Sequence, residues 1–177
     1  MSQVGKINYV NSKLGATMSG QQTTRYIYDS VVTVAGQTQF DFFQTFAGKT
    51  DLQTNLTTNK LDSSESMVIK SIYLNGDITA GLTGMSNLNI TVGNQVVLKD
   101  FNLAFNATNR GVAYDRLHSG FNDGQSVEIR LLTDIVIPPQ VNFRATLQLA
   151  ENTTLVDQSL TIGLKGYGVI FSAGNTF

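Results

Sequence analysis

The amino-acid sequence predicts an all-β fold, and three observations lead to that prediction. The segment from Val141 to Leu149, VNFRATLQL, alternates apolar and polar residues without a miss, as a strand with one buried face does. Other runs, such as Tyr26 to Val34, are dense in aromatic and β-branched residues, which fit a pleated surface. No segment carries the 3.6-residue period of a helix longer than two turns. Strands are therefore expected along most of the chain.

The N-terminal segment differs from the rest of the chain. Residues 1–24 are rich in Ser, Gly, Gln and Asn, and they contain Lys6 and Lys13 but no acidic residue. Arg25 is the next residue. Its apolar residues show no period, so we interpret residues 1–25 as an extended arm and residues 26–177 as a single domain. The arm either lies along a neighbouring subunit or an anionic interior, or it is a frayed terminus. If it is an arm, removing residues 1–24 leaves a folded domain and weakens assembly.

Two strands and a long loop are expected after the arm. Tyr26–Val34 forms the first strand, and Ala35–Gln37 turns the chain into a second, alternating run at Thr38–Phe43. Gln44–Lys60 is polar, lacks a clear period and is too long for a tight hairpin. It is therefore interpreted as a crossing loop.

A central strand and a hairpin follow. Met67–Leu74 is apolar on both faces, which indicates a strand inside a sheet, and a turn at Asn75–Asp77 ends it. Leu88–Val92 alternates, and Gly93–Asn94 can supply the left-handed residues of a two-residue turn. The return strand is Gln95–Lys99.

The later chain contains one ambiguous region and three more strands. Residues 101–124 are interpreted as irregular loop, with one short helical turn near Tyr114 to Leu117. Val127–Leu131 resumes alternation before a bend at Thr133–Asp134. The strand at residues 141–149 follows Pro138-Pro139, which stops a helix and leaves an extended entry.

The last expected strand, Leu160–Phe171, carries three glycines. Gly163, Gly166 and Gly168 indicate a bend or a close backbone approach within it. The total is about eight antiparallel strands joined by several long loops, which favours a jelly-roll sandwich with an extended N-terminal arm. An immunoglobulin-like sandwich is the second choice, because the chain has neither cysteine nor tryptophan. Core packing is expected for the aromatics of these strands: Phe40, Phe42, Phe43, Tyr73, Phe143 and Phe171.

The chain lacks the residue patterns of most catalytic sites. Its one histidine, His118, follows Asp115 by three residues, but no serine stands in a Gly-x-Ser-x-Gly elbow that would provide a nucleophile. The absence of cysteine removes thiolate chemistry, and no glycine-rich phosphate loop is present. We expect no enzyme, no catalytic residues, no cofactor and no metal site. A structural calcium near Asn122–Gly124, with Asp134 or Asp157, and a distant carboxylate pair remain weak alternatives.

Composition favours a surface that contacts other protein. Charged residues are 14% of the chain, against roughly a quarter in ordinary soluble domains, and the net charge is −1. A neutral polar surface leaves few charges to desolvate in an interface. The chain lacks the basic cluster that a dedicated nucleic-acid binder would carry. With no apolar run for a signal peptide or membrane span, we expect a soluble chain.

The pattern resembles the viral single jelly-roll capsid proteins that build icosahedral shells in some tailless bacteriophages. The resemblance rests on the polar, basic arm at residues 1–25, the eight or so strands, the long loops and the entry IVIPPQVNFRATLQL at residues 135–149. It implies a structural protein of the virion, made in the host cytoplasm, that self-assembles through contacts between its own copies and with other capsid proteins. The arm is less basic than genome-packaging arms usually are, so its contact with nucleic acid, an inner membrane or neighbouring subunits stays open.

The resemblance also selects candidate interface residues, namely the arm cations Lys6, Lys13 and Arg25. The alternative function is a receptor- or carbohydrate-binding β-sandwich, such as a fibre or spike head. Such a module would use the long segments 44–64 and 101–124. A small β-sandwich hydrolase using His118 ranks last.

Overall fold

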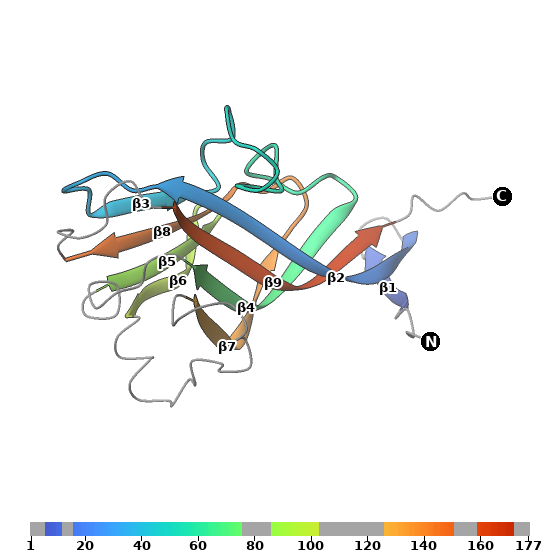
Figure 1. Cartoon of the computed structure of the whole chain (residues 1–177). Coiled ribbons are helices and arrows are strands. Elements are labelled where there is room, and N and C mark those ends of the chain that lie inside the picture. The colour runs from blue at the N-terminus through green and yellow to red at the C-terminus, as the bar shows by residue number, and fades with distance from the viewer. Residues whose placement is uncertain (1–5, 12–15, 76–85, 103–125, 151–158, 172–177) are drawn as a thin grey trace.

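The computed structural model describes residues 6–11, 16–75, 86–102, 126–150 and 159–171 (Figure 1). These residues form nine strands and no helix, so the all-β prediction is confirmed. One strand more than expected is present, and it lies in the segment interpreted as the arm. No helix able to cross a membrane exists in this part of the chain.

The strands form two antiparallel sheets. The five-stranded sheet has the order β1-β2-β9-β4-β7, built from β1 (Lys6–Asn11), β2 (Ala16–Val32), β9 (Ser159–Phe171), β4 (Glu65–Asn75) and β7 (Ser126–Ile137). The four-stranded sheet has the order β3-β8-β5-β6, built from β3 (Gln39–Phe42), β8 (Phe143–Leu149), β5 (Ser86–Val92) and β6 (Gln95–Asn102). From β2 onward the chain passes between the sheets at almost every connection, the β5–β6 hairpin excepted.

One hydrophobic core lies between the two sheets, as in a β-sandwich. β8 shows why the sequence alternates: Phe143, Ala145, Leu147 and Leu149 are buried, while the residues between them face outward. β2, β3, β4, β5, β7 and β9 also contribute buried apolar residues, and Phe40, Phe42 and Phe43 pack into this core. The centres of the tilted rings of Phe43 and Phe143 lie 5.3 Å apart. This contact joins the residue that follows β3 to the first residue of β8.

Strand β2 is much longer than the sequence suggested. It begins at Ala16, pairs with β1 up to Gln21, and pairs with β9 from Gly20 to Val32. The proposed boundary at residue 25 therefore falls inside a continuous strand. Figure 1 shows β1 and the first part of β2 extending past the end of the sandwich, beside the end of β9.

The turn between β5 and β6 lies where expected, with a difference in detail. Val92 pairs with Gln95, so the turn has two residues, and Gly93 has a φ of 60°. Asn94 does not have a positive φ. This fits the hairpin turn in which only the first central residue must be glycine.

The bend expected at Thr133–Asp134 is a bulge inside a longer strand. Ser71 of β4 pairs with Arg130 of β7, and Ile69 pairs with Ile135, so Lys70 alone faces residues 131–134. The strand continues beyond the bulge to Ile137. The glycine prediction for β9 is confirmed at Gly166, since a Cβ there would meet the backbone of Val68 and Ile69. The expected helical turn at residues 114–117 and most of the loop 101–124 lie outside the described residues.

Candidate functional surfaces

A cluster of tyrosines covers part of the outer face of the five-stranded sheet. Tyr26 of β2 lies 5.9 Å from Tyr28 and 6.1 Å from Tyr73 of β4, measured between ring centres. Gly163 of β9 separates the two strands, and its missing side chain leaves room for the Tyr26 ring, because a Cβ there would lie 2.6 Å from Cζ of Tyr26. Tyr73 was expected in the core. It lies instead between the buried residues Ile72 and Leu74 and so faces outward.

Lysines cover the edges of this cluster. Lys165 Nζ donates a hydrogen bond of 3.2 Å to the Tyr73 hydroxyl and lies 5.4 Å from the centre of its ring. Lys70 Nζ lies 5.9 Å from the centre of the Tyr167 ring and also pairs with Asp134. Tyr26 and Tyr167 remain 43% and 45% exposed. The surface thus combines accessible aromatic rings with hydrogen-bond donors.

Two pKa values in the cluster are raised. Partial burial raises the pKa of Tyr26 above its usual 10.0, and the adjacent Tyr73 adds to the effect. The hydrogen bond to Tyr73 raises the pKa of Lys165 above 10.5. Both groups therefore hold their proton more firmly in the folded protein.

We expect the free energy of unfolding to fall as the pH rises above the ordinary tyrosine value of 10.0. A group whose folded pKa is raised contributes stability that is complete below its unfolded pKa and is lost as the pH rises through the folded one. Tyr26 and Lys165 act in the same direction. Urea unfolding at a series of alkaline pH values measures the decline, and Tyr26→Phe should make it shallower. An equally steep decline in that variant would show that Tyr26 does not contribute.

A buried carboxylate fixes the long loop to the sheet. Asp29 of β2 is fully buried, and its two oxygens accept hydrogen bonds of 2.7 Å from Phe43 N and Lys49 Nζ. Phe43 has a φ of 62°, a left-handed conformation that a bulky residue adopts at a cost. Asp29 thus holds the residue that precedes the segment interpreted as a crossing loop and one residue in the first half of that segment. That segment contains no strand, as expected.

The same loop covers an edge of β2. Asn55 donates to Tyr26 O at 2.7 Å and accepts from Tyr28 N at 3.0 Å, which imitates the pairing of a neighbouring strand. Thr54 Oγ1 donates to Tyr28 O, and residue 54 forms an isolated bridge with residue 29. An exposed strand edge readily pairs with other chains, so this loop removes one site of unwanted association.

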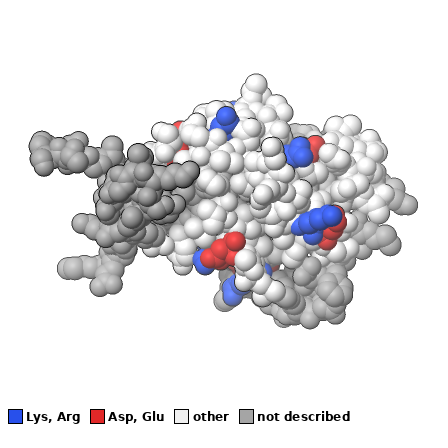
Figure 2. All heavy atoms as spheres, turned by 180° about the vertical axis from the view of Figure 1, so that it is seen from behind, with Lys and Arg blue, Asp and Glu red and all other residues white. Residues whose placement is uncertain are grey.

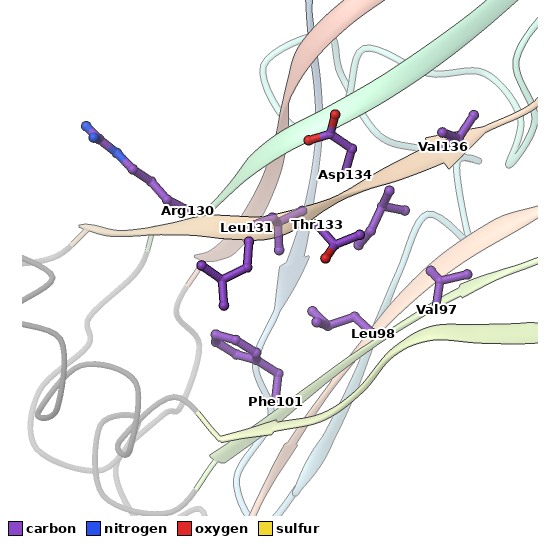
Figure 3. A pocket seen from close by; sticks show the side chains of 10 residues that line it. Val97, Leu98, Phe101, Arg130, Leu131, Thr133, Asp134 and Val136 are labelled. Carbon is purple, nitrogen blue, oxygen red and sulfur yellow. The ribbon is translucent and has the colours of Figure 1, made fainter.

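An apolar groove lies between the edges of the two sheets, where β6 and β7 end them (Figure 3). Its volume is about 380 Å³. Leu131 and Thr133 point from β7 toward Phe101 and Leu98 of β6, whereas Arg130 and Asp134 point away from the groove. Four exposed apolar residues lie on these two strands: Val96, Val97, Leu132 and Val136. No pattern in the sequence predicts this surface.

The predicted arm cations lie in different settings. Lys6 opens β1, and Lys13 lies outside the described residues. Arg25 is part of β2 and pairs with Glu65 of β4 at 2.8 Å, so its charge is balanced within the sandwich. His118, Asp115, Asp157 and Asn122–Gly124 also lie outside the described residues. The described residues contain no group of three side chains able to hold a metal ion.

Charged side chains are sparse on the surface. Figure 2 shows one face on which they are few, separated by wide uncharged areas, and mostly placed with opposite charges side by side. Among the described residues the ion pairs are Arg25–Glu65, Lys49–Asp29, Lys70–Asp134 and Arg130–Glu128. The low charge of the sequence therefore corresponds to a largely neutral polar face.

Comparison with protein-family models, with curated proteins and with solved structures finds no significant match.

Proposed function

We propose that this chain is a non-enzymatic structural protein of a virion, a single jelly-roll capsid protein whose copies assemble into an icosahedral shell. The observation that carries the proposal is the strand order, β2-β9-β4-β7 facing β3-β8-β5-β6. From β2 to β9, strands consecutive in the chain lie in different sheets except for the β5–β6 hairpin, and two interlocked Greek keys produce this order. On this proposal β2 to β9 are the eight strands of the jelly roll, and β1 is an addition to it.

Two further features support a role in assembly. The largely neutral face (Figure 2) can be buried against another subunit at little desolvation cost. The β1–β2 hairpin extends beyond the sandwich (Figure 1), where it can reach a neighbouring copy. Because Arg25 is already paired with Glu65, the arm keeps few free charges for a genome, and we propose that it contacts neighbouring capsid subunits.

The proposal is tested by size-exclusion chromatography and negative-stain imaging of the purified full chain at several salt concentrations and pH values. Trimers, pentamers, hexamers or closed shells are the expected species, since closed symmetry combines several contacts. A monomer that persists at the highest concentration would contradict a capsid protein that assembles without partners.

Removing residues 1–19 should weaken assembly and leave the sandwich folded. This deletion removes β1 and the part of β2 that precedes Gly20, where pairing with β9 begins. It is preferable to a deletion of residues 1–24, which would also remove four residues paired with β9 beyond Gly20. Circular dichroism and thermal unfolding report the fold, and particle yield reports assembly. Unaltered particle yield would show that the hairpin is not an assembly element.

The tyrosine cluster favours a second candidate, a carbohydrate-binding module. Sugar rings stack on exposed aromatic faces, and Tyr26 and Tyr167 are exposed beside the donors Lys165 and Lys70. A glycan array with the full chain tests this candidate. Binding that is lost in Tyr167→Ala and kept in Leu52→Ala, an exposed site outside the cluster, would favour it over the shell.

A further inference from the structure

The bulge in β7 presents a segment of strand that no other described strand pairs with. β7 lies at the end of the five-stranded sheet, so its outer edge has no strand neighbour in the described ranges. Residues 131–134 also leave the ladder with β4, where only Lys70 faces them. Among the residues that the structure describes, no strand occupies their outward backbone groups, and an added strand can pair with them.

The most exposed apolar residue of this edge lies at the middle of the bulge. Leu132 is 83% exposed, and Val97 and Val136 flank it on the same rim of the molecule. An apolar patch rimmed by polar groups on a chain with a neutral surface is typical of an interface with another protein. The groove beside it, lined by Leu98 and Phe101, adds further apolar surface.

The charges around Leu132 indicate what the partner is. Arg130 precedes Leu132 by two residues and Asp134 follows it by two, so the alternation of a strand places all three on one face. If two copies of this segment run antiparallel about a two-fold axis at Leu132, each Arg130 lies opposite the other copy's Asp134. Within one copy Asp134 pairs with Lys70 and Arg130 lies 3.9 Å from Glu128, so the contacts between copies would extend these ion pairs into a network. Leu132 then meets Leu132, and Leu131 meets Thr133. Opposite charges in facing positions stabilise a strand pair, and like charges would oppose it.

We propose that β7 forms a two-fold contact between two copies of this chain, with residues 130–134 of one copy paired antiparallel to the same residues of the other. The contact joins two five-stranded sheets into one continuous sheet and buries the exposed Leu132. It is isologous, since the same patch serves both copies. The contact deepens the proposed shell function and rests on that function for its biological role, but its test requires no shell.

Cysteine cross-linking of the full-length protein tests the contact. The chain has no cysteine, so Leu132→Cys introduces the only thiol. Two such thiols meet at the axis, and mild oxidation should convert most of the protein into a covalent dimer on a non-reducing gel. Leu52→Cys is the matched control, because Leu52 is 91% exposed but lies in the loop on β2. No dimer for the first variant, or equal dimer for both, would overturn the proposal.

A charge reversal gives a second measurement. Arg130→Asp places like charges opposite each other twice in each contact, so the dimer should dissociate about tenfold more readily in sedimentation experiments. Arg144→Asp, an exposed arginine on β8 of the other sheet, should leave dissociation unchanged. Equal effects of both variants would contradict the proposed pairing.

The outcomes separate this contact from the shell itself. Cross-linked dimers without particles would support the contact and contradict the proposed function. Particles formed by Leu132→Cys protein that does not cross-link would support the shell and overturn the contact. A strand from another protein on this edge would give neither dimers nor a response to oxidation, and it too would overturn the proposal.

Discussion

Gly166→Ala should unfold the protein or lower its free energy of unfolding by about 3 kcal/mol or more. A Cβ at this position would lie 2.9 Å from the carbonyl carbon of Val68 and closer still to its oxygen, with Ile69 Cα at 3.1 Å. These are backbone atoms of β4, the strand paired with β9 at the bulge, so they cannot rotate away as a side chain can. Equilibrium urea unfolding measures the loss.

Gly163→Ala is the control for this prediction. The added methyl group there meets the ring of Tyr26, whose end lies on the exposed face and can move outward. We therefore expect a clearly smaller loss than for Gly166→Ala, with the sandwich intact. Equal losses would show that the close approach at Gly166 does not set the strand spacing.

Asp29→Asn should destabilise the protein by about 3–5 kcal/mol, because it leaves the Lys49 ammonium nearly buried without its counter-charge. Side-chain exposure is 14% for Lys49 and 0% for Asp29, so water compensates little. The amide oxygen can still accept from Phe43 N, whereas the amide nitrogen faces Lys49, so the variant keeps the first bond and removes the ion pair together with its hydrogen bond. Denaturant unfolding measures stability, and limited proteolysis at the loop reports whether the loop detaches.

The double variant Asp29→Asn with Lys49→Met provides the matched test. Removing both charges eliminates the unpaired ammonium, so most of the lost stability should return. If the double variant is as unstable as Asp29→Asn alone, the loss comes from the amide substitution and not from the ion pair.

The sequence predicted the strands that have one buried face most accurately. β8 and β5 have a clean two-residue period, and Gly93 marks the turn that leads into β6; all three strands were expected within a few residues of their observed bounds. β4 was expected to be central from its apolar residues on both faces, and it lies between β9 and β7. Alternation predicts a strand well because burial of one face is what imposes it.

Other features depended on contacts that a single segment does not reveal. The first part of β2 has no apolar period because it extends beyond the core, where pairing with β1 and β9 stabilises it. Tyr73 was expected in the core because nothing in its own strand reveals that Gly163 and Lys165 lie beside it on the outer face.

Part of the site had a signal in the sequence. Asp29 stands between Ile27 and Val31 on the inward face of its strand, and a carboxylate at such a position indicates a buried partner. Its partner, Lys49, lies twenty residues away in a loop without a period, so the pair required the structure. The β7 surface required it too, because exposure of Leu132 depends on the bulge opposite Lys70.

The position of β9 has a consequence for the order of folding. This strand, the last described in the chain, lies between β2 and β4, so the larger sheet cannot form until residues 159–171 have been synthesised. Until then β2 and β4 each lack the strand that lies between them. The pairing of β2 with β9 also closes a loop of more than a hundred residues, from Val32 to Ser159. Such distant contacts slow folding and prolong exposure of unpaired strands. A protein of this topology should therefore fold slowly and only once β9 has left the ribosome, so that chaperones acting before that point influence the yield of native subunits.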